Sequence, residues 1–307
     1  MAGGSYPKYG LRKQHTLNKN QWLSGYLFIL PNFIGFLVFS GIPVIMGFCV
    51  SLTNYTGFGK LDFIGFKNYM KLFSDSDFTI AFRNNMVYSF TSVPMTVFGS
   101  LLLALMLNKK VYGAKFFKTI YFFPNLTSMV AVGCVWLQLF ETKNGPVNQF
   151  LTSLGVTNPP KWFWSSSTAL LTVVIVVVWK QIGYYMVMFS GSLKNIPSHL
   201  YESAKIDGAG PWQSFRYITW PMLTPTTFMV IILTFISSFQ VFDIISVTTQ
   251  DGGPGRATSV LVMRIYLEAF RYGRMGYGSA IGYFLFVLVF IITLIQWQGQ
   301  KRWVFDD

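Results

Sequence analysis

Long stretches without a charged side chain divide this sequence. Windows that lack Asp, Glu, Lys and Arg cover residues 20–59, 84–108, 119–140, 217–242 and 275–300, and the apolar stretch 168–193 contains one charge, Lys180. A helix needs about 20 mainly apolar residues to cross a bilayer, where lipid cannot satisfy an open backbone. We therefore predict six membrane-spanning helices, near residues 23–52, 84–107, 119–140, 168–193, 223–246 and 276–297.

Proline and glycine refine these limits. Residues 144–160 also lack charge, but Asn144-Gly145-Pro146 marks them as a loop. The first window is far longer than the apolar region of about 7–15 residues in a signal peptide, so we do not expect a cleaved leader. Pro31 and Pro43 lie within that window and predict a kink or a late start in the first span.

Composition agrees with a membrane protein. Hydrophobic residues make up 52% of the 307 residues and charged residues only 11%, against about 25% in soluble domains. This excludes a disordered chain, which needs low hydrophobicity and high charge density. The net charge of +13 can reflect nucleic-acid binding, an anionic membrane surface or the positive-inside rule, and composition alone does not choose among them.

The distribution of basic residues predicts the orientation. The N-terminal tail and the 108–118 connection carry no acid but several bases: Lys8, Arg12, Lys13, Lys19, Lys109, Lys110, Lys115 and Lys118. By the positive-inside rule both segments are cytoplasmic. The expected organisation is a cytoplasmic tail (1–22), a first span (23–52), an outer loop (53–83), a core transmembrane domain (84–297) with an inner connection (194–222), and a cytoplasmic tail (298–307). Most of the basic excess then reports topology, so we expect contact with the lipid bilayer and none with nucleic acid.

The 194–222 connection contains the start and stop signals of two short helices. Pro197 stops the incoming helix, Ser198 can cap a new one, and Gly208 suits a left-handed end. Pro211 then opens a second helix at its first position. The result is a glycine-rich elbow. It is either a hairpin on the membrane surface, with aromatic side chains in the headgroups, or a rigid knob that docks into a partner.

The elbow also carries a family motif. Eight positions match, at the family's spacing, the EAA loop of permease subunits of binding-protein-dependent ABC importers: Glu202, Ala204, Asp207, Gly208, Ala209, Phe215, Ile218 and Pro221. Ser203 departs from the usual alanine but remains small. Three further segments resemble the carbohydrate branch, in the larger type of paired permease found in maltose and glycerol-3-phosphate importers: 63–69, 238–243 and 252–255. The resemblance covers about residues 22–297.

The resemblance implies an all-α integral membrane protein with six transmembrane helices of the type I ABC importer permease fold. It implies a prokaryotic cell-membrane protein that pairs with a second permease, two cytoplasmic ABC ATPase subunits and an extracytoplasmic sugar-binding protein. The eight matched residues and Ser203 would couple the chain to the ATPase. Because the sequence has no G-x-x-x-x-G-K-[ST] phosphate loop, we expect no enzyme activity and no bound cofactor in this chain, with ATP hydrolysed by the partner.

Lys180 is the main candidate for a substrate contact. A lysine at mid-membrane costs about 2.5–3.5 kcal/mol, which predicts a water-filled cavity or a polar neighbour. Asp243 has the opposite charge, but it differs in depth by roughly 10 Å. Five nearby side chains offer hydrogen-bonding groups that suit a sugar: Gln181, Tyr184, Ser237, Ser238 and Gln240. Gly183 adds a possible break in the helix. Ordinary hydrogen bonds between helices are the alternative.

Two further alternatives stay open. The turn that contains Gly252, Gly253 and Pro254 either needs positive φ angles or contacts the binding protein. The same machine can instead carry a non-sugar solute, such as a glycerol phosphodiester or a polyamine. A secondary transporter or membrane enzyme is a remote alternative, because the sequence has no metal-ligand cluster, no nucleophile constellation and no repeated pair of broken helices.

Overall fold

The computed structural model describes residues 19–108 and 112–303. Across these residues the regular secondary structure is helical, and one isolated bridge joins Thr53 and Phe63. Five described helices are long and apolar enough to cross a membrane, and the number is six if one bent helix pair is counted as a single span. Several bases used to predict the orientation lie outside the described residues: Lys8, Arg12, Lys13, Lys109 and Lys110.

The chain divides into two compact units, residues 1–49 and 50–307. The first span consists of α1 (Lys19–Phe36), the π-turn η1 (Leu37–Gly41) and α2 (Ile42–Ser51). It therefore does not start late. The expected irregularity is the π-turn, which lies directly before Pro43. A proline ring clashes with the carbonyl four residues earlier in a regular helix, and a wider turn relieves that clash.

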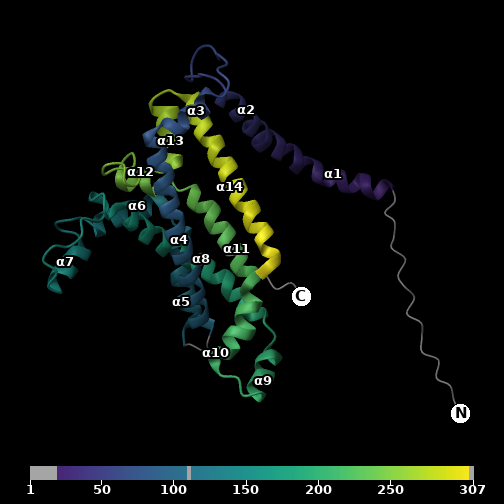
Figure 1. Cartoon of the computed structure of the whole chain (residues 1–307). Coiled ribbons are helices and arrows are strands. Elements are labelled where there is room, and N and C mark those ends of the chain that lie inside the picture. The colour runs from purple at the N-terminus through teal and green to yellow at the C-terminus, as the bar shows by residue number, and fades with distance from the viewer. Residues whose placement is uncertain (1–18, 109–111, 304–307) are drawn as a thin grey trace. The chain divides into compact units, whose positions relative to one another are not determined.

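The larger unit is built on four long helices: α4 (Ser76–Asn108), α8 (Ala169–Asn195), α11 (Trp220–Phe239) and α14 (Met275–Trp303). In Figure 1 they run between two ends of the bundle, one of which carries α9 (Ser198–Ile206) and α10 (Pro211–Ser214), while the other carries α3 (Lys67–Ser74) and α13 (Leu261–Tyr266). The α8 helix packs along α4, α5 (Ala114–Leu126) and α11. It is continuous through Gly183, so the predicted break there is wrong.

The predicted third span, 119–140, is not one straight helix. It is α5 followed by α6 (Met129–Leu139), and the two are bent by 102°. Thr127 and Ser128 at the junction have extended backbone. The ammonium group of Lys180 on α8 donates a hydrogen bond to the carbonyl of Asn125 at 3.2 Å. A carbonyl in the last turn of a helix lacks an intrahelical donor, so Lys180 supplies one where the span breaks.

The predicted fifth span, 223–246, is displaced along the chain. The helix starts at Pro211 in α10, passes through the π-turn η3 (Phe215–Thr219) and ends with α11 at Phe239. The helix continues through Pro221, because the π-turn before this residue accommodates its ring. Asp243 opens a separate short helix, α12 (Asp243–Thr249), and so does not lie in the fifth span.

The connections between the predicted spans contain further helices. Residues 53–83 include α3 and the start of α4, and residues 141–167 include α7 (Pro146–Ser153) and the 3₁₀ turn η2 (Trp162–Trp164). Residues 247–275 include α13 and the π-turn η4 (Leu267–Arg271).

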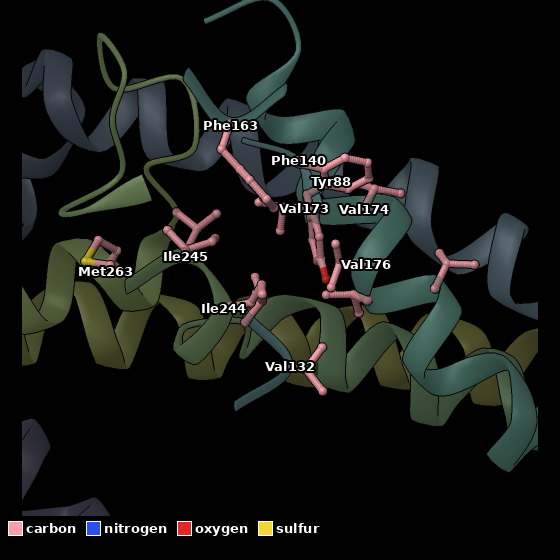
Figure 2. Packing of buried hydrophobic residues seen from close by; sticks show 14 of the residues in the cluster. Tyr88, Val132, Phe140, Phe163, Val173, Val174, Val176, Ile244, Ile245 and Met263 are labelled. Atoms are coloured by element: carbon pink, nitrogen blue, oxygen red, sulfur yellow. The ribbon is translucent and has the colours of Figure 1, made fainter. Parts of the chain in front are cut away.

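Figure 2 shows a core cluster that ties these segments to the spans: valines 173, 174 and 176 of α8 lie among Tyr88, Phe140, Phe163, Ile244 and Ile245. These buried side chains anchor η2 and α12 on α8.

Candidate functional site

The elbow between α8 and α11 has two helices, as predicted. Gly208 ends α9 in the left-handed conformation, with φ +76°, and the backbone N–H of Ala209 donates to the carbonyl of Ala204 at 2.8 Å. Pro211 begins α10. One detail was wrong: Pro197 occupies the N-cap of α9, and no side chain caps it, whereas Ser198 had been expected to do so.

One face of the elbow is fastened to the bundle. Leu200, Tyr201 and Ile218 pack against a buried cluster that includes Leu193 of α8 and Leu223 of α11. The hydroxyls of Tyr201 and Thr219 are 2.8 Å apart. Hydrophobic packing and this hydrogen bond therefore hold the knob as one body with the two spans that flank it.

The opposite face is uncovered. Four of the predicted coupling residues are exposed: Glu202, Ser203, Asp207 and Gly208. The other five are partly buried and support the knob: Ala204, Ala209, Phe215, Ile218 and Pro221. Large apolar side chains on the same elbow are strongly exposed, namely Ile206 (86%), Trp212 (72%) and Tyr217 (73%). Carboxylates beside uncovered apolar side chains are typical of a surface that binds another protein.

The six predicted substrate-path residues do not form one site in this chain. Gln181, Ser237 and Ser238 line a small cavity of about 10 Å³ with side chains of α4, which is barely room for one water molecule. Gln240 instead lines a groove of about 360 Å³ along α14. Lys180 approaches the carbonyl at the break between α5 and α6. Tyr184, one helical turn further along α8, is 41% exposed.

Sequence reasoning missed a polar stripe on α4, of which Ser92 and Thr96 line this small cavity. Its members are buried and recur at helical spacing: Asn85, Ser89, Ser92, Thr96 and Ser100. Ser238 donates to the hydroxyl of Ser89 at 2.8 Å, so this predicted path residue serves in a contact between helices. The spacing of small polar residues within a charge-free window was the signal that could have found the stripe.

The turn predicted to contact a binding protein is tightly constructed. Gly252 has φ +88°, and a Cβ there would lie 2.6 Å from the Cα of Ser259. The hydroxyl of Thr258 donates to the carbonyl of Gly253 at 2.8 Å. Gly252 is therefore required by the positive φ angle and the close backbone contact of this turn. The carbonyl group of Gly253 is used inside the turn, and both Gly253 and Pro254 are partly buried.

A buried charge cluster at the same end of the bundle was also missed. Glu268 is 1% exposed and Arg264 is 7% exposed. Arg264 lies 2.5 Å from Glu268 and 3.2 Å from Asp77, and Arg274 lies 2.7 Å from Glu268. The hydroxyl of Tyr277 donates to Asp75 at 2.6 Å. The cluster links the start of α4 with α13, η4 and α14, which are far apart in sequence.

The carboxyl groups of this cluster respond differently to their surroundings. Burial raises the pKa of Glu268, against the opposing effect of Arg264 and Arg274. Burial also acts to raise the pKa of Asp75, but hydrogen bonds from Tyr277 and the backbone of Asp77, with the charge of Arg264, leave that pKa below its usual value. Among the residues with described positions, no group of His, Cys, Asp and Glu has the arrangement of a metal site.

Known proteins resemble this chain over most of its length. Residues 82–300 match the family described as "Binding-protein-dependent transport system inner membrane component". The probable ABC transporter permease protein YurN of Bacillus subtilis (strain 168) is 35% identical over 289 residues, which are 93% of this chain and 98% of YurN. The arabinooligosaccharides transport system permease protein AraP of the same strain is 34% identical over 273 residues, 88% of this chain and 86% of AraP.

A solved structure has the same arrangement of helices. It is the bacterial alginate ABC transporter in complex with an alginate pentasaccharide-bound periplasmic protein, and one of its chains matches with a TM-score of 0.82 and 26% identity. The match covers 92% of this chain and 96% of that chain. The chain therefore belongs to the binding-protein-dependent transport system inner membrane components, and it has the type I ABC importer permease fold, in which the bent pair α5–α6 counts as one span.

Proposed function

We propose that this chain is the transmembrane permease subunit of an ATP-driven sugar importer, and that its transported solutes are oligosaccharides. It forms the translocation path with a second permease and receives sugar from an extracytoplasmic binding protein. Two supports carry the substrate class: AraP is named for arabinooligosaccharides, and the matching solved transporter was captured with an alginate pentasaccharide on its periplasmic protein.

The elbow couples this chain to its partner through its uncovered face. It is fastened to α8 and α11 through Leu200, Tyr201 and Ile218, so a displacement of the knob is passed to both spans. Glu202 and Asp207 offer acceptors to a partner, and Trp212 offers apolar area. We assign this face to an ABC ATPase, one of two such subunits, which binds and hydrolyses ATP while this chain binds no cofactor.

The proposal places the elbow in the cytoplasm of a prokaryotic cell, together with both termini. The turn at Gly252, Gly253 and Pro254 then lies outside, where a binding protein can reach it. The substrate path follows the open side of α8 at Lys180 and Tyr184. Gln181, Ser237 and Ser238 line a separate small cavity against α4, and Gln240 lines a groove along α14, so we assign the path first to Lys180 and Tyr184.

Charge reversal on the elbow tests this function. In the complete importer reconstituted in vesicles, we expect Glu202→Lys to lower ATP-dependent oligosaccharide uptake at least about tenfold, because it replaces an exposed carboxylate on the docking face with a positive charge. Ser198→Ala, on the same short helix, is the matched control, since its hydroxyl caps nothing in the structure. Membrane insertion of both variants should equal that of the wild type. Normal uptake by Glu202→Lys would refute the coupling role.

A further inference from the structure

Lys180 is a cation that the rest of the described chain does not neutralise. No carboxylate among residues 19–108 and 112–303 lies within 4.0 Å of its ammonium group. Its hydrogen bond runs to a backbone carbonyl, that of Asn125, at 3.2 Å. The side chain is partly open, at mid-length of a membrane-spanning helix. The cost of placing that charge in a membrane is therefore only partly offset within this chain.

The arginines near the other end of the bundle behave differently. Arg256 pairs with Asp77, Arg264 with Glu268, Arg271 with Asp251 and Arg274 with Glu268. These four arginines have counter-charges, whereas the lysine inside the span has none among the described residues.

Capping the broken span does not account for the positive charge. A neutral amide can also donate a hydrogen bond to the Asn125 carbonyl, and lysine carries three N–H donors, of which one is used here. The remaining donors point to a ligand with a strong acceptor.

The surroundings of Lys180 fit a sugar that carries such an acceptor. Tyr184 and Trp179 expose 41% and 43% of their surface, and aromatic faces pack well on the apolar faces of sugar rings. Trp179 also lines an apolar pocket of about 310 Å³ with Pro124 and Trp136, in the angle between α5 and α6. Tyr184, one helical turn from Lys180 on α8, offers an exposed aromatic face to a sugar ring that carries a carboxylate.

We propose that the ammonium group of Lys180 binds a carboxylate of the transported solute, so that this importer carries acidic, uronate-containing oligosaccharides. This inference rests on the proposed sugar-importer function. The matching solved transporter imports alginate, an acidic polysaccharide, which shows that the fold accommodates such a substrate.

The test separates charge from hydrogen bonding at Lys180. Vesicles containing the complete importer, with its own binding protein, receive a mixture of acidic oligosaccharides from alginate, pectin and glucuronoxylan and neutral ones from arabinan, starch and xylan. Mass spectrometry of the vesicle contents identifies what is imported. Lys180→Gln keeps a donor but loses the charge, Lys180→Met loses both, and Lys180→Arg keeps the charge. Lys115→Gln removes an exposed charge from the start of α5 as a matched control.

We expect the wild type to accumulate acidic oligosaccharides. Both Lys180→Gln and Lys180→Met should reduce that accumulation about tenfold or more, because a charge-assisted hydrogen bond is lost, whereas Lys180→Arg and Lys115→Gln retain it. Lys180→Met can instead reduce the accumulation of acidic and neutral sugars equally, while Lys180→Gln accumulates both normally. That result would show that Lys180 only donates a hydrogen bond to the end of α5, and it would overturn the inference.

Uptake of neutral sugars alone, abolished by Glu202→Lys, would also overturn the acidic substrate while leaving the importer function in place. If the wild type accumulates no sugar from either pool, both proposals fail together.

Discussion

Two glycines on α8 show how a single residue decides the packing of a span. A Cβ on Gly183 would lie 1.8 Å from the backbone carbonyl oxygen of Tyr121, whereas a Cβ on Gly191 would have no atom within 4 Å. The close approach of α5 to α8 therefore depends on Gly183. It also brings the end of α5 within reach of Lys180.

Gly183→Ala should destabilise the purified protein by about 1–3 kcal/mol or more, because the two backbones must separate. Gly191→Ala should be neutral or slightly stabilising, since alanine favours the helix by about 1 kcal/mol. The midpoint of thermal unfolding in detergent measures both. An unchanged midpoint for Gly183→Ala would contradict the tight crossing.

At the same scale, Asp75 gives a prediction about pH. Its folded pKa lies below the ordinary 3.8, so its stabilising effect is complete above that value and is lost as pH falls through the folded pKa. Tyr277→Phe removes the hydroxyl that donates to Asp75 at 2.6 Å and should move this pKa back upward.

We therefore expect Tyr277→Phe to lower the free energy of unfolding by about 1–2 kcal/mol at neutral pH. The difference in stability between the variant and the wild type should narrow as pH falls below 3.8. Unfolding midpoints measured from pH 7 to pH 3 test this, with the fully exposed Tyr112 changed to Phe as control. A difference in unfolding midpoint that stays constant over the whole pH range would show that the Tyr277 hydroxyl does not lower the pKa of Asp75.

At the scale of elements, the charge cluster holds α13 and η4 against the start of α4. Arg264 is 7% exposed and contacts both Glu268 and Asp77. Removing one member of a buried ion pair leaves its partners without compensation, and this costs about 3–5 kcal/mol. An exposed pair such as Arg271 with Asp251 is worth about 0–1 kcal/mol.

Arg264→Met should accordingly lower the stability far more than Arg271→Met, although both remove one arginine from neighbouring helical turns. Thermal unfolding gives the size of each loss, and protease sensitivity of the 251–274 segment locates it. Equal effects of the two substitutions would mean that the buried cluster contributes no more than a surface pair.

At the scale of the whole molecule, the proposed orientation can be tested with two single cysteines. The native Cys49 and Cys134 are replaced by serine, and Ser203→Cys on the elbow is compared with Lys60→Cys at the opposite end; both positions are exposed. An impermeant maleimide should label Lys60→Cys in intact cells and Ser203→Cys only after permeabilisation. Labelling of Ser203→Cys in intact cells would show that the orientation is the reverse of the proposed one.

Much of this architecture can be predicted from local sequence. About 20 residues without charge must form a helix in lipid, so most spans were found, and the elbow was recognised because Pro197, Gly208 and Pro211 act on their immediate neighbours. The predicted limits of the fifth span were wrong because a π-turn before Pro221 lets the helix continue through this proline. The third span was predicted without its bend, although Pro124 and the polar residues after it, Asn125, Thr127 and Ser128, are a local signal for a break.

Contacts between distant segments are what local patterns cannot specify. Ser238 pairs with Ser89 and Arg264 pairs with Asp77, and such choices depend on which helices become neighbours. Lys180 combines both levels. Its position in an apolar window marked it as unusual, but its bond to the Asn125 carbonyl, and the lack of a nearby carboxylate among the described residues, follow from the way α5 breaks and crosses α8. Hydrophobicity places a residue in the membrane, whereas the packing of helices decides what it meets there.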